Sequence, residues 1–270
     1  MLLNNTQIAV HPNARIGKNV NIFPFSYIDE DVVIGDNCEI GPNAIILNGA
    51  RLGNNCKVFP GAVISAIPQD LKYDNEYTTV EIGDNTTIRE YVTINRGTNA
   101  YKKTTVGKNC LIMAYCHIAH DCVIGNNCVL VNCVNLAGHV QIGDWVVLEG
   151  LVAVNQFIHI GDHAFVAGGS LVRKNVPPYV KAAREPLAFA GVNVVGLRRR
   201  DFSEERIQLI EEIYRILFIK SQNISNGLRE IETQIPDSEE KQLILRFISN
   251  SDKGIMRGFH SINNGSVHVA

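Results

Sequence analysis

The sequence predicts a mainly β protein, in which a parallel β-helix of hexapeptide repeats is followed by a C-terminal α-helical domain. Three observations predict this fold. Aliphatic residues recur every six positions, glycine with Asp or Asn follows them at turn spacing, and amphipathic segments replace the repeat near the C-terminus. We expect the β-helix over residues 1–182 and the helical domain over residues 183–270.

The aliphatic residues share one register for most of the first 172 positions. A hexad is too short for a helical period, so each is expected to form one short strand and one corner, with three hexads closing a coil of eighteen residues. Each aliphatic side chain then points inward and stacks on its equivalent in the next coil. The residues in this register are Val10, Ile16, Ile22, Ile28, Ile34, Ile40, Ile46, Leu52, Val58, Ile64, Ile82, Ile88, Ile94, Val106, Ile112, Ile118, Ile124, Leu130, Leu136, Ile142, Leu148, Val154, Ile160, Val166 and Val172.

Six of the seven cysteines occupy a second repeated position, two residues before the aliphatic one. Consecutive hexads belong to different walls of the coil, so these thiols are not expected to converge on a metal. Small buried hydrophobic residues fit this position, and free cysteine is one of them. We expect structural packing for Cys38, Cys56, Cys110, Cys116, Cys122 and Cys128.

Two excursions interrupt the repeat, near residues 66–79 and 97–104, and the register resumes after each. Chain that leaves a regular scaffold and returns to the same register is usually a functional loop. After the repeat ends, Ser203 is expected to cap a helix that begins with Glu204 and Glu205. A second helix is expected over about 226–235, and a third opens with Asp237 and Glu240 at capping-box spacing. These helices are expected to cover the end of the solenoid.

Composition excludes several classes of protein. The 270 residues are 46% hydrophobic and 19% charged, with a formal charge of -2, so the sequence favours neither nucleic acid nor an anionic membrane as a partner. The N-terminus lacks an export signal, and no window has eighteen uninterrupted apolar residues. We therefore expect a cytoplasmic protein without stable membrane insertion, whose thiols are reduced.

The segment HIAHDC, residues 117–122, brings His117, His120 and Asp121 together in the sequence. Adding one coil of eighteen residues places Gly138 next to His120 and His139 next to Asp121. Three imidazoles in this arrangement are compatible with a metal site, while a histidine beside a carboxylate is typical of a general base. The residues by themselves leave both hypotheses open. A third hypothesis, that these are ordinary surface histidines, also stays open.

Several motifs over nearly the whole chain resemble the UDP-N-acetylglucosamine acyltransferase family: QDLKY, TVEIGDNTTIRE, VTINRGT, HIAHDCVIGN, LAGHVQIGD, VPPYV, GVN and GLRRRDFS. The resemblance implies a left-handed β-helix and a homotrimer with active sites between subunits. It also implies transfer of a (3R)-3-hydroxyacyl group from acyl carrier protein to the 3-hydroxyl of UDP-N-acetylglucosamine, the first step of lipid A synthesis. No metal and no cofactor of the enzyme's own are implied, since the donor carries its phosphopantetheine on the carrier protein.

The resemblance also implies roles for particular residues. It makes His120 the general base, Asp121 its orienting carboxylate and Gly138 the N–H donor to the oxyanion. The acceptor sugar would be bound by Asp70, Lys72, His117 and His139. Gln156, Asn193 and Arg199 would contact the nucleotide or the acyl-pantetheine arm, and Gly168 would set the depth of the acyl groove, with room for a longer chain.

Three residues depart from the family pattern, since Asn95, Asn155 and Pro186 stand at histidine positions. Three alternative functions are weighed against the first. The related N-acyltransferase of the same pathway normally carries a domain before its coils, whereas the hexads here start by residue 10. Zinc-dependent γ-type carbonic anhydrases have a His-x4-His pattern, whereas this chain has His-x2-His. A non-catalytic scaffold would not need His120.

Overall fold

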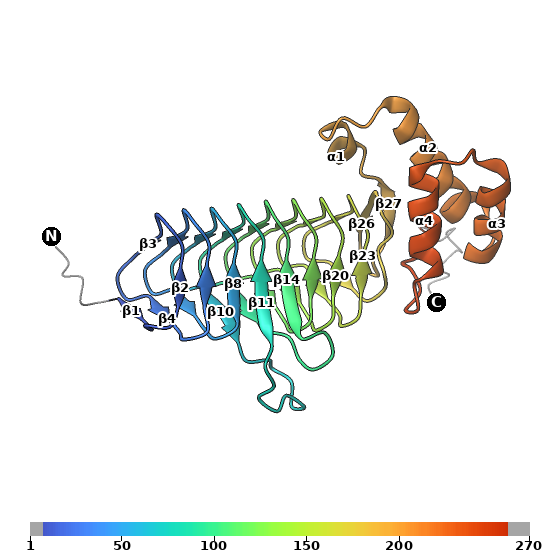
Figure 1. Cartoon of the computed structure of the whole chain (residues 1–270). Helices are drawn as coiled ribbons and strands as arrows, with labels where there is room; N and C mark the ends of the chain where they lie inside the picture. The colour runs from blue at the N-terminus through green and yellow to red at the C-terminus, as the bar shows by residue number, and fades with distance from the viewer. Residues whose placement is uncertain (1–7, 259–270) are drawn as a thin grey trace, which may run out of the picture.

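A computed structural model describes residues 8–258. Its strands form the three walls of a triangular prism, and up to β25 every third strand belongs to the same wall (Figure 1). Wall 1 contains β1 (Ala9–Val10), β4 (Tyr27–Ile28), β7 (Ile45–Ile46), β10 (Val63–Ala66), β13 (Thr93–Asn95), β16 (His117–Ile118), β19 (Asn135–Leu136), β22 (Ala153–Val154) and β25 (Leu171–Val172).

The other two walls follow the same rule. Wall 2 contains β2 (Arg15–Ile16), β5 (Val33–Ile34), β8 (Ala50–Leu52), β11 (Thr79–Ile82), β14 (Lys103–Val106), β17 (Val123–Ile124), β20 (Gln141–Ile142) and β23 (His159–Ile160). Wall 3 contains β3 (Asn21–Ile22), β6 (Glu39–Ile40), β9 (Lys57–Val58), β12 (Thr87–Ile88), β15 (Leu111–Ile112), β18 (Val129–Leu130), β21 (Val147–Leu148), β24 (Phe165–Val166), β26 (Val180–Ala183) and β27 (Ala188–Val192).

The register confirms the predicted coil. Ile118 pairs with Leu136 and Leu136 pairs with Val154, each eighteen residues further along the chain. Ile64 pairs with Ile94, and Ile94 pairs with Ile118, so each excursion lengthens one coil without shifting the strands. Because an inward residue must stack on an inward residue, a register slip would expose the core.

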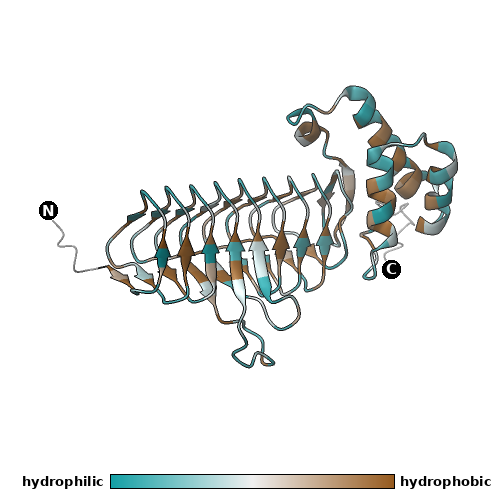
Figure 2. Ribbon diagram, in the orientation of Figure 1, coloured by the Kyte–Doolittle hydropathy of each residue, from teal (hydrophilic) through white to brown (hydrophobic). Residues whose placement is uncertain are grey.

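The repeated positions form one continuous core. Ile28, Ile64 and Ile118 have no exposed surface, and Figure 2 shows hydrophobic segments recurring from coil to coil along the solenoid. The six cysteines of the second repeated position are buried, and all seven thiols are free. Buried Sγ atoms contact carbonyl oxygens of the next coil, as Cys128 does with Gly143 at 3.1 Å. The prediction of structural packing for these cysteines is confirmed.

The corners between the walls differ in chemistry. The asparagine corner, between walls 2 and 3, carries Asn37, Asn55, Asn85, Asn109 and Asn127 with positive φ, a conformation that asparagine tolerates well. The apolar corner, between walls 3 and 1, carries Phe25, Tyr91, Tyr115 and Leu151, all more than half exposed. The histidine corner, between walls 1 and 2, carries His120, His139 and Phe157. Both excursions leave from the histidine corner, at the lower edge of Figure 1.

Beyond residue 182, where the second domain is expected to begin, the chain first makes β27, which runs antiparallel to β26 and closes wall 3. Helices follow: α1 (Val194–Arg198), α2 (Glu204–Arg215), a π-helical turn (Ile216–Lys220), α3 (Ile224–Gln234) and α4 (Glu239–Ser249). Ser203 caps α2 as predicted. The predicted start of the last helix was wrong, because Ser238 caps it by accepting from Lys241 N–H, while Asp237 accepts from the Gln242 side chain.

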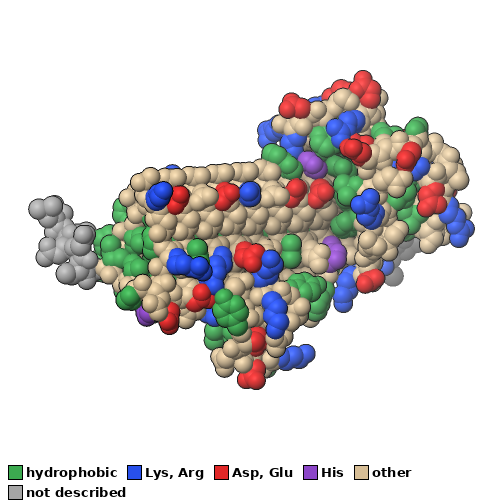
Figure 3. All heavy atoms as spheres, viewed as in Figure 1, with side chains coloured by type: hydrophobic (Ala, Val, Ile, Leu, Met, Phe, Trp, Pro, Cys, Tyr) green, Lys and Arg blue, Asp and Glu red, His purple; other side chains and the backbone are tan. Residues whose placement is uncertain are grey.

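The helices cover the C-terminal end of the solenoid, as predicted. Tyr214, fully buried in α2, donates to the Pro178 carbonyl at 2.6 Å and so joins α2 to the last coil. No helix within residues 8–258 is long and apolar enough to cross a membrane. On the face seen in Figure 3, acidic and basic side chains alternate along the solenoid rather than forming a patch of one sign.

Candidate active site

His120 lies at the histidine corner, two residues after β16. Its Nδ1 is 2.8 Å from Oδ2 of Asp121, and its side chain remains 13% exposed while that of Asp121 is completely buried. Asp121 has a φ of 58°, a left-handed conformation that short polar residues accept at a tight corner. The corner therefore presents an accessible imidazole backed by an inaccessible carboxylate.

Asp121 accepts three further hydrogen bonds from the second excursion. Thr98 donates its N–H to Oδ1 at 3.0 Å and its hydroxyl to Oδ2 at 2.6 Å, and the Tyr101 N–H reaches Oδ1 at 3.1 Å. Burial by itself raises the pKa of Asp121, but the hydrogen bonds from His120, Thr98 and Tyr101 outweigh burial and lower the pKa to about 2. The carboxylate is ionised at neutral pH and can only accept, so Nδ1 of His120 carries the proton and Nε2 offers a lone pair.

Gly138 lies against His120 in the next coil, as the eighteen-residue period predicts. A Cβ atom added to Gly138 would be 2.7 Å from both Cε1 and Nε2 of His120, so only glycine lets the imidazole occupy this position. Among residues 8–258, no acceptor is found for the Gly138 N–H, whereas the neighbouring His139 N–H donates to the His120 carbonyl. A free N–H beside the basic nitrogen is the arrangement that stabilises an oxyanion.

His139 continues the column. Its ring packs edge-on against that of His120, with centroids 5.2 Å apart, and stacks on Phe157 at 4.5 Å. Burial and the nearby His120 lower the pKa of His139, while the charges of Asp121 and Asp70 oppose this shift. The Nδ1 atom of His139 is buried without a hydrogen-bond partner in the described part of the chain. His139 is therefore a neutral ring with unused polar capacity beside the pair.

His117 lies on the wall 1 side of the corner. Its Nδ1 is 2.8 Å from the hydroxyl oxygen of Thr93 in the preceding coil. Burial, and secondarily His120, lowers the pKa of His117. His117 is thus neutral near pH 7 and faces the same region as His120.

The first excursion brings Asp70 and Lys72 toward this corner. The Asp70 carboxylate accepts from the Lys72 N–H at 3.0 Å, which fixes a tight turn. The Asp70 charge acts on the pKa of His139, so the turn lies close to the histidine column. The Lys72 side chain is exposed.

The remaining predicted residues divide among the corners. Gln156 is exposed at the histidine corner, one coil beyond Gly138. Gly168 lies at the apolar corner, between β24 and β25, and Asn193 and Arg199 lie near the asparagine corner around α1. Within one chain, therefore, the predicted site residues face three different directions.

Asn193 has a structural role that the sequence did not indicate. It is 5% exposed and caps α1 by accepting from the Gly196 N–H, while its Nδ2 donates to the His163 carbonyl at 2.9 Å. Arg198 pairs with Glu204, and Arg200 lies over the Trp145 ring. The Arg199 side chain is exposed, and no partner for that side chain is found within residues 8–258.

The three departures from the family pattern lie in different surroundings. Asn95 is 3% exposed and donates to the Ile67 carbonyl at 2.9 Å, so it anchors the first excursion. Asn155 is exposed at the histidine corner. Pro186 follows a cis peptide bond in the turn between β26 and β27. Asn95 is in register with Ala119, next to His120, and Asn155 is in register with Ala137, next to Gly138. Both of these departures therefore border the histidine column, whereas Pro186 does not.

A metal hypothesis has a geometric basis, but its members differ from those expected. Ligand atoms of His120, Asp121 and His139 lie within 4.8 Å of one another, and His117 is not in this group. Both Asp121 oxygens already accept two hydrogen bonds each. A metal on this carboxylate would have to displace donors of the second excursion, so the geometry fits an acid–base pair better.

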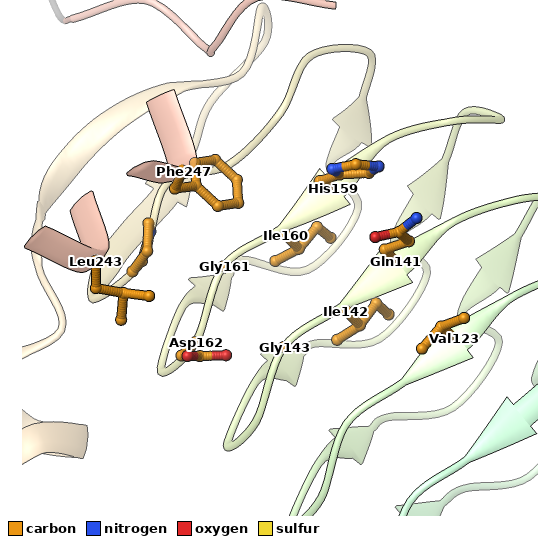
Figure 4. A pocket seen from close by; sticks show the side chains of 11 residues that line it. Val123, Gln141, Ile142, Gly143, His159, Ile160, Gly161, Asp162, Leu243 and Phe247 are labelled. Atoms are coloured by element: carbon orange, nitrogen blue, oxygen red, sulfur yellow. The ribbon is translucent and has the colours of Figure 1, made fainter. Parts of the chain in front are cut away.

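A cleft of about 230 Å³ lies between wall 2 and α4 and reaches the asparagine corner at Gly143, Gly161 and Asp162 (Figure 4). Val123, Gln141 and His159 form its floor, and Leu243 and Phe247 of α4 form its wall. Neither His120 nor Asp121 lines it. The cleft therefore does not contain the chemistry of the candidate site.

Sequence reasoning missed three residues that shape the site: Thr93, Thr98 and Tyr101. Because the register resumes unchanged after residues 97–104, the sequence predicted that this excursion is a functional loop. No periodicity indicated which of its atoms would reach Asp121.

Comparison with known proteins agrees with an acid–base site on a hexapeptide-repeat solenoid. A family model for domain 2 of UDP N-acetylglucosamine O-acyltransferase matches residues 175–256, and the bacterial transferase hexapeptide model matches residues 13–48, 31–66 and 103–138. The acyl-[acyl-carrier-protein]–UDP-N-acetylglucosamine O-acyltransferase of Sulfurihydrogenibium sp. is 52% identical over 92% of this chain and 94% of its own length. The enzyme of the same name from Trichlorobacter lovleyi is 46% identical over 92% of this chain and 97% of its own length.

Solved structures agree with these matches. A UDP-N-acetylglucosamine acyltransferase from Bacteroides fragilis superposes with a TM-score of 0.91 at 47% identity, covering 94% of this chain and all of that one. The Francisella novicida enzyme also gives 0.91, at 38% identity, over 94% of this chain and 93% of that one. The expected left-handed hexapeptide β-helix is confirmed.

Proposed function

Because the chain belongs to the UDP-N-acetylglucosamine O-acyltransferase family and is thus an acyltransferase, we propose that it moves a (3R)-3-hydroxyacyl group from acyl carrier protein to the 3-hydroxyl of UDP-N-acetylglucosamine. This reaction is the first step of lipid A synthesis. The observation that carries the proposal is the His120–Asp121 pair packed against Gly138, whose N–H has no acceptor within residues 8–258.

The pair suits attack by an alcohol on a thioester. Nε2 of His120 takes the proton from the sugar hydroxyl as its oxygen attacks the thioester carbonyl carbon, a contribution of about 10² to 10⁴ in rate. The ionised Asp121 stabilises the imidazolium that forms. The carbonyl oxygen becomes an oxyanion facing the Gly138 N–H, worth about 10² or more. When the C–S bond breaks, the departing thiolate takes the proton from His120.

The first excursion and the histidine column surround this pair with groups for the acceptor. In the proposal, Asp70 and Lys72 contact the sugar, with His117 and His139 on the walls of the pocket. The unpaired Nδ1 of His139 supports this role, because a buried polar atom without a partner costs free energy until a ligand satisfies it.

We propose a homotrimer because the site is incomplete in one chain. Gly168, Asn193 and Arg199 lie at corners other than that of His120, so they reach the same ligand only from a neighbouring subunit. The apolar corner offers a surface for that neighbour, with Tyr91, Tyr115 and Leu151 at 54%, 58% and 68% exposure. Aligned exposed aromatic residues of this kind are typical of interfaces.

The donor side of the site is assigned to the same neighbour, except Gln156, which lies at the histidine corner with His120. Gly168 would border the acyl groove, where glycine leaves room for a longer chain. Gln156, Asn193 and Arg199 would contact the nucleotide or the pantetheine arm, and the exposed Arg199 suits a phosphate. The donor brings its phosphopantetheine with the acyl carrier protein, so the proposal includes no other cofactor. Free thiols at all seven cysteines agree with a reducing compartment, the cytoplasm.

One assay tests the proposal: purified protein, UDP-N-acetylglucosamine and hydroxyacyl carrier proteins of graded chain length, with products identified by mass spectrometry. We expect a singly O-acylated nucleotide sugar, and its loss in His120→Ala. Absence of that product with every donor would reject the assignment. Transfer to an amino sugar instead would indicate the N-acyltransferase. One zinc per subunit by metal analysis would indicate a carbonic anhydrase, and full turnover of His120→Ala would remove the role of the pair.

A further inference from the structure

The second excursion, residues 97–104, converges on one carboxylate. Thr98 donates both its N–H and its hydroxyl to Asp121, and Tyr101 adds its N–H. The Thr98 hydroxyl makes the shortest of these bonds, 2.6 Å, to the same Oδ2 that accepts from His120. The carboxylate is completely buried, so water does not compete for this oxygen.

The hydroxyl of Thr98 has little freedom to point elsewhere. Its Oγ1 accepts from the Ala100 N–H at 3.2 Å, which leaves its own hydrogen to point toward Asp121. The Thr98 carbonyl accepts from the Lys102 N–H at 2.8 Å, which closes the loop on itself. Thr98 is 8% exposed. A buried hydroxyl fixed on both sides sets the direction of its hydrogen bond.

The same loop also holds the first excursion. Glu76 accepts from the Asn99 N–H at 2.9 Å with one carboxylate oxygen and from the Asp74 N–H at 2.8 Å with the other. The loop that fixes Asp121 is therefore bonded to the loop that carries Asp70. Residues next to Thr98 thus connect the two parts of the candidate site.

We propose that Thr98 is a positioning residue that acts through Asp121 to orient the His120 imidazole. Oδ2 must face Nδ1 of His120 for Nε2 to point at the acceptor hydroxyl. Without the Thr98 hydroxyl, Oδ2 loses its strongest neutral donor and the carboxylate plane is free to turn. The inference rests on the proposed role of the His120–Asp121 pair.

The test is Thr98→Val, which removes the hydroxyl while keeping the branched shape and the N–H donor. We expect kcat to fall about 10- to 100-fold, the usual effect of losing a hydrogen bond that orients a reacting group, with KM for UDP-N-acetylglucosamine within about twofold of wild type. Thr98→Ser restores the hydroxyl and should return kcat to within about threefold. Thr87→Val is the matched control, because Thr87 is a half-buried threonine on wall 3, and it should leave kcat unchanged.

A double-mutant cycle separates positioning from general damage. If Thr98 acts through Asp121, then Thr98→Val added to Asp121→Asn should lower kcat by less than about threefold further. A full multiplicative loss, or Thr98→Ser as defective as Thr98→Val, would overturn the inference. So would a Thr98→Val enzyme with wild-type kcat. A normal rate for Asp121→Asn would instead refute the role of the pair, so the two failures are distinguishable. If Thr98→Val does not fold, Thr98→Ala removes the hydroxyl and makes the same comparison with Thr98→Ser.

Discussion

The substitution Gly138→Ala tests the site at its tightest contact. The added Cβ would be 2.7 Å from Cε1 and Nε2 of His120, whereas carbon contacts are comfortable at about 3.5–4.0 Å. The imidazole must therefore move by about 1 Å, and a misplacement of about 1 Å costs about 10²-fold in rate. We expect kcat to fall about 100-fold, equivalent to about 2.7 kcal/mol of transition-state stabilisation. The φ angle of Gly138 is not positive, so the backbone accepts alanine.

Steady-state kinetics with the carrier-protein thioester and UDP-N-acetylglucosamine would measure the effect, and thermal unfolding would check the fold. Gly150→Ala is the matched control for folding, because its Cβ would meet nothing closer than the Asn132 carbonyl at 3.4 Å. Both variants should unfold near the wild-type temperature. If Gly138→Ala keeps more than about half of the wild-type kcat, then the contact between His120 and Gly138 does not set the catalytic geometry.

Three further predictions follow from the same structure. Asp121→Asn keeps the shape of the side chain but removes the charge that stabilises the imidazolium. We therefore expect kcat in the transfer assay to fall about 10²- to 10⁴-fold. A loss of kcat below about fivefold would contradict this. Ile118→Ala opens a cavity in a fully buried stack and should lower the free energy of unfolding, measured with denaturant, by about 2–5 kcal/mol. A decrease below about 1 kcal/mol would show that the coils relax to fill the cavity. Burial and Arg200 lower the pKa of His163 to about 4. The unfolded chain then binds a proton below about pH 6.5 that the folded chain refuses, and stability should fall between about pH 6.5 and 4 by at most about 3 kcal/mol. His163→Gln should flatten this part of the pH–stability curve, and an identical slope would refute the assignment.

Much of the scaffold could be predicted because it is periodic. An aliphatic residue at every sixth position can be buried only if each hexad supplies one inward side chain. This condition determines the length of each strand, the position of each corner and the number of residues in a coil. The juxtaposition of Gly138 and His120 follows from the same arithmetic, since no excursion lies between them. Here a local pattern carries information about contacts between distant residues.

Contacts made by the two excursions could not be predicted from the six-residue period. Thr98 and Asp121 are twenty-three residues apart, and the chain between them includes an irregular loop whose path no period describes. Asp121 does not occupy an inward aliphatic position of the repeat, yet its side chain is completely buried. Its ionisation depends on donors that only the folded loop provides.

The amino-acid sequence alone determined the stacked coils and the neighbours within the histidine corner, because regular hydrophobic spacing leaves one way to bury the core. The tertiary structure decided the electrostatics, since the charge on Asp121 depends on hydrogen bonds from backbone atoms, whose positions no side-chain pattern encodes. It also decided where Asn193 and Arg199 lie, because their positions depend on how the chain packs after the last coil.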